Sequence, residues 1–250
     1  MRLHLGPDAL VTPTDGILAS PPRYHLDIPA VSVCTAIEQH EHEQLLRSTF
    51  GSVDWLWSGD DEFRFQRSSR ILTSLSLRVP EINTMSQEEA HAWLDVPPKE
   101  AGLQALSDEN FSVPPAHKRW LSEEADWLVC TLSTPPARKA DTERLRITGD
   151  LDLVFEGGIY SGWVLKNPAD HLASGSEGPP SHTATQSFKF AFKKFMDFFI
   201  QPTYDLMAEE DPNTLGELES LRDLILRLPE DVRRKALLDQ IADQHERWYG

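Results

Sequence analysis

A change in hydrophobic period across residues 172–182 constrains the fold more than any other feature of the sequence. Before this segment, short apolar and β-branched runs alternate with turn residues, which is typical of strands. After it, Phe188, Phe192 and Phe195 recur at i, i+4 and i+7, which places them on one face of a helix. The two patterns together predict an α+β protein.

Turn chemistry indicates how the strands pair. Glu156-Gly157-Gly158 separates the strand-like runs 145–155 and 159–165 and gives the clearest hairpin signal in the chain. A second turn at 58–61 separates two apolar-aromatic runs, and a third run spans 71–79. We therefore expect a mainly antiparallel sheet within residues 31–170.

Two capping boxes predict helices that flank this sheet. In each, a hydroxyl and a carboxylate three residues apart satisfy exposed backbone N–H groups at the start of a helix. Thr35 with Glu38 precedes a helix expected over 36–48, and Ser86 with Glu89 precedes one expected through residue 93.

Beyond residue 182 the sequence predicts a C-terminal three-helix segment. Its helices are expected at 183–199, 214–228 and 229–248, each with an apolar stripe. Gly, Ser and Pro are frequent in residues 172–182, which is typical of a linker. The predicted organisation is a sheet region at 1–171, a linker at 172–182 and a helical region at 183–250, with both regions packed as one compact unit.

The charge narrows the classes of ligand. The chain has 40 acidic and 24 basic residues, for a formal net charge of -16, and both halves are negative. Such a surface repels nucleic acid and anionic membranes and favours basic partners. The opening segment lacks the apolar core of a signal peptide, and Cys34 and Cys130 are not in a CxxC pair. We therefore expect a cytoplasmic protein with buried thiols that binds neither nucleic acid nor membranes.

One hairpin, residues 149–166, resembles the core of the PD-(D/E)xK nucleases. In that family a strand presents an Asp, and the next strand presents an acidic residue two positions before a Lys. Asp152 and Lys166 match the family's Asp and Lys, but Val164 stands where the second carboxylate is expected. The resemblance implies a divalent-metal nuclease, whereas a single carboxylate does not hold Mg²⁺ in the way that chemistry needs. An ordinary polar-tipped hairpin is the alternative interpretation.

Residues 38–43 contain the densest set of possible metal ligands. On a helix, Glu38 and His42 lie one turn apart on a common face, so both can reach one metal ion. No other histidine completes a standard zinc spacing, and a solvated, charged helix face is the alternative. The sequence lacks the phosphate-loop, dinucleotide, serine-hydrolase and zincin motifs, so no cofactor is expected.

Trp55 and Trp57 are predicted on one side of a strand, because side chains alternate across it. The pair fits either a core plug or an exposed recognition patch. In the second case, the acidic turn at Asp60, Asp61 and Glu62, which is expected to be exposed to water, steers a basic protein toward the aromatic contact area. These five residues form the predicted partner-binding site.

The sequence thus leaves three hypotheses for function. The first is a non-catalytic acidic protein-binding module, such as an immunity or inhibitor-like protein that neutralises a basic partner. The second is an enzyme or metal-binding protein with a dispersed site, in which Asp150 joins Glu38, His42 and Asp152. The third is a homo-oligomer formed through the C-terminal aromatic helix. No catalytic residue is assigned, and whether the chain is an enzyme stays open.

Overall fold

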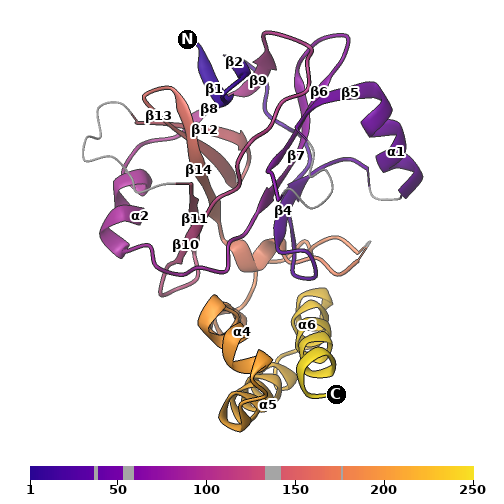
Figure 1. The fold of residues 1–250 in the computed structure, drawn as a ribbon, viewed down its shortest axis with the longest axis vertical. Helices are drawn as coiled ribbons and strands as arrows, with labels where there is room; N and C mark the ends of the chain where they lie inside the picture. Colours follow the sequence, from indigo (N-terminus) through magenta and orange to yellow (C-terminus); the bar gives the residue numbers. More distant parts are fainter. Residues whose placement is uncertain (37–38, 53–58, 133–141, 176) are drawn as a thin grey trace.

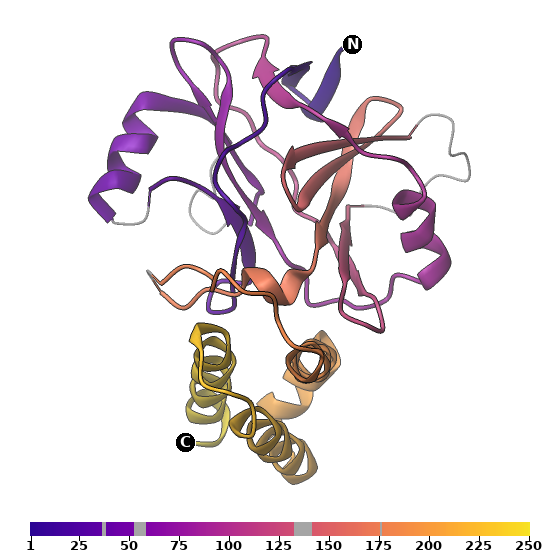
Figure 2. The same cartoon turned by 180° about the vertical axis from the view of Figure 1, so that it is seen from behind.

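The computed structural model describes residues 1–36, 39–52, 59–132, 142–175 and 177–250. Two β-sheets lie side by side at one end of the molecule, and the C-terminal helices form a group at the other end (Figure 1). The chain that joins them crosses the junction between the two groups, which Figure 2 shows from behind. The predicted combination of helices and sheets is confirmed.

Sheet A is nearly closed into a barrel. The order β8-β12-β13-β14-β1-β2-β9 returns on itself, because residues 99–105 pair through β8 with β12 and through β9 with β2. Two further strands, β10 and β11, extend from β14. In the described part of the chain the strands are β1 (Leu3–Gly6), β2 (Ala9–Thr14), β8 (Lys99–Glu100), β9 (Gly102–Ala105), β10 (Lys118–Leu121), β11 (Trp127–Thr131), β12 (Thr142–Thr148), β13 (Leu151–Glu156) and β14 (Ile159–Lys166).

This sheet corrects the expectation of a mainly antiparallel sheet, because it is mixed. β1 pairs with β14 in parallel, and β8 pairs with β12 in parallel. Both pairings join strands that are far apart in sequence. Alternation and turn residues locate individual strands and hairpins, but they carry no information about such distant pairs.

Sheet B is antiparallel, with the order β3-β4-β7-β6-β5. Its strands are β3 (Arg23–His25), β4 (Ala30–Val33), β5 (Thr49–Ser52), β6 (Glu62–Gln66) and β7 (Leu72–Arg78). Helix α1 (Gln39–Ser48) flanks this sheet, and helix α2 (Gln87–Leu94) flanks the far side of sheet A (Figure 1). The capping box of Ser86 and Glu89 forms as predicted at the start of α2.

The predicted hairpin of β13 and β14 is present. Gly157 and Gly158 have φ angles of +58° and +80°, the left-handed backbone that a two-residue type I′ turn requires. Within β14, Gly162 lets β11 approach closely, since a Cβ at this position would lie 2.1 Å from the carbonyl oxygen of Cys130. Only glycine therefore fits where sheet A branches to β11.

The C-terminal region contains four helices rather than the predicted three. They are α3 (Gln186–Phe198), α4 (Gln201–Ala208), α5 (Pro212–Leu226) and α6 (Val232–Tyr249). The prediction missed α4 because eight residues give only about two helical turns, too few for a clear periodic pattern. Among the residues that the structure describes, no helix combines the length and apolar character needed to cross a membrane.

The segment at 172–182 begins inside the core. Leu172 and Ala173 are buried, and the N–H of Ala173 donates to the carbonyl of Tyr24 over 3.0 Å. A short 3₁₀ helix, η2 (Pro168–His171), precedes them. One continuous cluster of buried apolar side chains includes residues of both sheets and of α3, α5 and α6. The helical group is therefore packed against the sheets by shared apolar contacts.

Arg119 of β10 fixes the end of α3. Its guanidinium is buried, and Nη2 donates to the carbonyl oxygens of Met196 and Phe199 over 2.6 and 2.7 Å. A cation beside the C-terminal carbonyls of a helix also interacts favourably with the helix dipole. The hydroxyl of Tyr24 reaches the same helix, where it donates to the sulfur of Met196 over 3.2 Å.

The surface of α4–α6 is acidic. In residues 201–250 the exposed carboxylates outnumber the exposed Lys and Arg side chains by ten to four, so this end of the molecule attracts cations. The carboxylates belong to Asp205, Glu209, Glu210, Glu217, Glu219, Asp223, Glu230, Asp239, Asp243 and Glu246, and the cations to Arg222, Arg227, Lys235 and Arg247.

Arg119→Ala should lower the free energy of unfolding by about 3 kcal/mol, since it leaves two helix-end carbonyls without their charged donor. Chemical denaturation measures the change. Lys118→Ala in the same strand, where the side chain is half-exposed, is the matched control and should cost less than about 0.5 kcal/mol. An equal loss in both variants would mean that the strand, and not the guanidinium, fixes α3.

Candidate functional site

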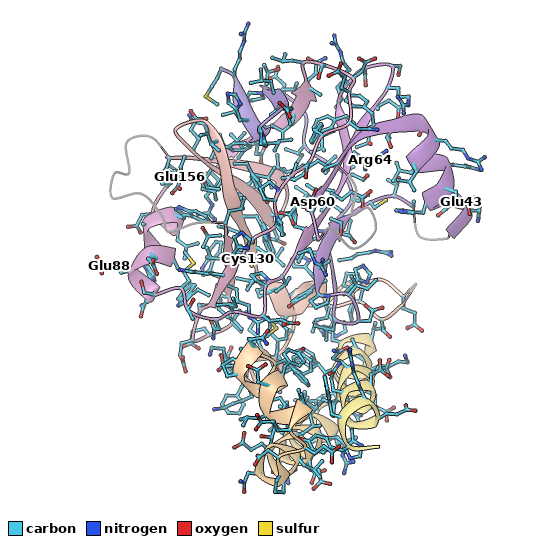
Figure 3. The ribbon with its side chains drawn as sticks, in the orientation of Figure 1. Glu43, Asp60, Arg64, Glu88, Cys130 and Glu156 are labelled. Carbon is cyan, nitrogen blue, oxygen red and sulfur yellow. The ribbon has the colours of Figure 1, made fainter. Side chains whose placement is uncertain are left out.

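A groove of about 280 Å³ lies on the outer face of sheet B, beside α1. Figure 3 labels Glu43 of α1 and Arg64 of β6 in this part of the molecule. The groove brings together side chains from four strands, the β3–β4 turn and α1. Its lining residues are His25, Asp27, Ile28, Ala30, Ser32, Cys34, Ala36, His42, Leu45, Glu62, Ser74, Leu75 and Ser76.

Strand alternation explains the polar floor. In β4 and β7, valine and leucine point into the core, and the residues between them point outward. Ser32 of β4, Ser76 of β7 and Glu62 of β6 are paired in register, so they form a row across three adjacent strands. The sequence carried this signal as serines alternating with Val and Leu, but it is weak without knowledge of the strand order.

His25 and Ser32 form a polar pair at one end of the floor. Nε2 of His25 lies 3.2 Å from the hydroxyl of Ser32. Burial lowers the pKa of His25, and the nearby charge of Asp27 opposes this effect only in part. The imidazole is therefore neutral at physiological pH. In the described part of the chain no hydrogen bond joins Asp27 to His25, so the pair lacks the carboxylate that orients a catalytic histidine.

Cys34 lines the groove as a protonated thiol. Its sulfur accepts from the N–H of Ala36 over 3.2 Å, and burial is the largest cause of a raised pKa. The negative charge of Glu62 raises it further. Since the thiolate is the nucleophilic form, this environment disfavours covalent chemistry at neutral pH. Cys130 is fully buried, as predicted, whereas Cys34 is only half-buried.

Glu62 supplies negative charge to the floor. Its carboxylate lies 4.0 Å from Nε of Arg64, at the outer limit of an ion pair. The Arg64 guanidinium directs its hydrogen bonds elsewhere, to the hydroxyl of Thr49 and to the carbonyls of Ser52 and Leu46. Among the described residues that line the groove, Asp27 and Glu62 are acidic and none is Lys or Arg. The groove therefore suits a cationic group.

Two residues that the sequence predicted for different roles lie in the same groove. His42, predicted as a metal ligand, and Glu62, predicted for partner binding, both line the groove. Glu38, the other predicted ligand, lies outside the described residues. Within the described ranges, no group of three or more His, Cys, Asp or Glu side chains is placed to hold a metal ion.

The predicted partner patch is only partly described. Trp55 and Trp57 lie outside the described residues. Asp60 is half-buried and accepts a hydrogen bond from the hydroxyl of Ser112. The expectation that the acidic turn is exposed to water is wrong for Asp61, which is 0% exposed. Alternation gives the reason, since Asp61 shares the inward side of the chain with Phe63 and Phe65.

Asp61 links the two sheets. Its Oδ1 accepts from the N–H of Arg78 over 2.8 Å, and its Oδ2 accepts from the hydroxyl of Tyr160 in β14 over 2.9 Å. Burial raises the pKa of Asp61 to about 7, against the opposing effect of these hydrogen bonds. The same burial raises the pKa of Tyr160. Asp61 is thus a buried carboxyl between sheets and does not belong to a surface patch.

The hairpin that resembles the nuclease core holds a structural ion cluster. Asp152 is buried and accepts from Nε of Arg144 over 2.6 Å and from Nε of Arg146 over 3.0 Å. Val164 lies directly opposite it on β14 and is buried beneath α2 with Trp93. Asp152 is therefore paired with two arginines and faces an apolar residue, so the resemblance does not extend to a pair of metal-binding carboxylates.

The aromatic face of α3 is mostly buried. Phe188, Phe192 and Phe195 belong to the core, as their spacing predicts. Phe190 is 55% exposed, and the ammonium of Lys194 lies over its ring. Phe198 is half-buried against the ring of Phe199. The homo-oligomer hypothesis for this helix stays a prediction.

Comparison with protein-family models, with curated proteins and with solved structures gives no match to this chain.

Cys34 should react with iodoacetamide at about pH 8 roughly tenfold more slowly than free glutathione, because its raised pKa leaves less thiolate and burial limits access. Mass spectrometry of the intact protein measures the rate. Labelling of the Cys34→Ser variant reports Cys130 alone and should be negligible in the folded state. Fast labelling of Cys34 at neutral pH would contradict this account and point to an activated nucleophile.

Asp61→Asn should weaken the dependence of stability on pH. Since the folded pKa of about 7 lies above the ordinary value of 3.8, protonated Asp61 stabilises the fold at low pH. This contribution, up to about 4 kcal/mol, is present below about pH 4 and is lost as pH rises through about 7. Chemical denaturation at several pH values measures the free energy of unfolding of both proteins. As pH increases, this free energy should fall less in the variant than in the wild type. The control, Asp108→Asn at an exposed carboxylate, should keep the wild-type profile.

Proposed function

We propose that the protein is a non-catalytic binding module for a basic protein partner, and that the groove beside α1 receives a Lys or Arg side chain of that partner. The single observation that carries this proposal is the composition of the groove, which has two carboxylates, serine hydroxyls and, among the described residues, no Lys or Arg side chain. A buried cationic group needs anionic and hydrogen-bonding partners of this kind.

The shape and charge of the groove support the proposal. Its volume of about 280 Å³ is small for a cofactor but sufficient for the end of one long side chain. The row of Ser32, Ser76 and Glu62 offers acceptor oxygens along the floor. The formal net charge of -16 increases the rate at which a basic protein meets this surface.

The chemistry of the same residues supports a binding role over a catalytic one. Cys34 is held as a thiol, and the His25–Ser32 pair lacks an orienting carboxylate within the described residues. A binding groove needs neither a thiolate nor a proton relay. An immunity or inhibitor-like role, in which the protein neutralises a basic enzyme, suits this chemistry.

Glu62→Gln should weaken binding of a short Lys- or Arg-containing peptide by about tenfold, because one charge-assisted hydrogen bond contributes about 1.5 kcal/mol. Calorimetric titration at low and high salt measures the affinity, and the ring signals of His25 and His42 in NMR spectra report the place of binding. Glu88→Gln on α2 removes an equal charge on the other side of the molecule, as Figure 3 shows, and should leave the affinity unchanged.

Two outcomes would contradict the proposal. An equal loss of affinity in Glu62→Gln and Glu88→Gln would mean that the net charge attracts the peptide without a defined site. A metal ion that co-purifies with the protein in a fixed ratio, and is lost in His42→Ala, would favour the enzyme or metal-binding alternative.

A further inference from the structure

A second groove, mostly apolar, lies between α5 and α6 on the helical end of the molecule. Its volume is about 380 Å³. The two helices lie side by side in both Figure 1 and Figure 2, at the helical end of the molecule, whereas α1 lies beside sheet B. The two grooves share no lining residue. This surface is therefore separate from the site of the proposed function.

Helical spacing builds the groove. On α5, Glu219, Arg222 and Leu226 recur at i, i+3 and i+7, and on α6, Leu238, Ala242 and Glu246 recur at i, i+4 and i+8. The stripes span about 10.5 and about 12 Å, or roughly two helical turns each. The floor therefore matches the length over which an amphipathic helix presents apolar residues at i, i+3 or i+4, and i+7.

The apolar floor is open to solvent at one end. Leu226 is 46% exposed, although large apolar side chains are commonly buried within helical hairpins. A partner that covers Leu226 and the Leu238–Ala242 stripe would remove this apolar surface from water.

The surrounding charge identifies the occupant. Glu219 and Glu246 stand on the two walls, and residues 201–250 expose ten carboxylates against four Lys and Arg side chains. The lining also includes Arg222, whose guanidinium lies 3.8 Å from a carboxylate oxygen of Asp223. A second copy of this acidic surface or an anionic membrane would be repelled, whereas a basic helix would be attracted.

We infer that the α5–α6 groove binds a cationic amphipathic helix, with apolar side chains on Leu226, Leu238 and Ala242 and with Lys or Arg side chains against Glu219 and Glu246. The inference goes beyond the proposed function, because it assigns a second surface and a helical ligand. The test of one groove can give a negative result while the test of the other gives a positive one.

Three synthetic peptides test the inference. The first has Leu at i, i+3, i+4 and i+7 with Lys elsewhere, the second keeps the Leu pattern with Glu in place of Lys, and the third keeps Lys with Ser in place of Leu. Fluorescence anisotropy measures affinity for the full-length protein, and circular dichroism measures helix formation on binding. We expect the first peptide to bind as a helix, at least tenfold more tightly than the other two.

Leu226→Lys is the decisive variant, since it removes apolar area and adds a repelling charge. The substitution should lower the affinity for the first peptide at least tenfold. Leu206→Lys on α4 is the matched control, because Leu206 is 44% exposed and does not line the groove. This variant should bind the first peptide with the affinity of the wild type. Thermal unfolding of both variants verifies that they fold. Glu62→Gln should leave binding of this peptide unchanged, which separates the two sites.

Several results would overturn the inference. These are equal binding of the Lys and Glu peptides, absence of binding by the first peptide, or an unchanged affinity in Leu226→Lys. Dimerisation of the protein that Leu226→Lys abolishes would assign the groove to a second copy of the chain. Binding to vesicles of anionic lipid that the same change abolishes would assign it to a membrane surface.

Discussion

The hydrogen-bonded carboxyl of Asp61 links the two sheets, and the candidate groove lies on the face of sheet B that this packing turns outward. One oxygen accepts from the backbone of β7 and the other from Tyr160 of β14. Since residues alternate across a strand, packing one face of β6 and β7 against sheet A turns Ser76 and Glu62 to the opposite face. One face of sheet B therefore packs against sheet A, and the opposite face carries the polar floor of the groove.

The two grooves are formed by different elements and differ in chemistry, but both are lined by two carboxylates. The groove on sheet B is smaller and has a row of serines and a carboxylate on its floor, whereas the groove between α5 and α6 is larger and mostly apolar. Arg119 and the shared core attach the helices to the sheets, so both grooves are carried by one packed body. A partner with a basic loop and a basic helix could contact both, with affinity gained from the second contact once the first is made.

Local patterns in the sequence predicted local structure well. The Gly157-Gly158 hairpin, the capping box at Ser86 and the buried Phe stripe of α3 each depend on neighbouring residues, and each is found. The barrel was not predictable, because its parallel pairs join distant strands. The site was predicted in fragments: His42 and Glu62 were candidates for different reasons, and only the strand order places them in one groove with His25 and the serines.

The near-closure of sheet A also limits how another chain can attach. Open strand edges expose unpaired backbone groups that a foreign strand can join. In sheet A, the segment that contains β8 and β9 pairs with β12 on one side and with β2 on the other, so it closes the sheet. The outer edges of β3, β5 and β10 each form a hydrogen bond with a nearby loop. These bonds join Ala173 to Tyr24, Gly51 to Asn110 and Arg119 to Ile82. At each of these points a strand from another molecule would have to displace an existing hydrogen bond, which disfavours edge-to-edge pairing there.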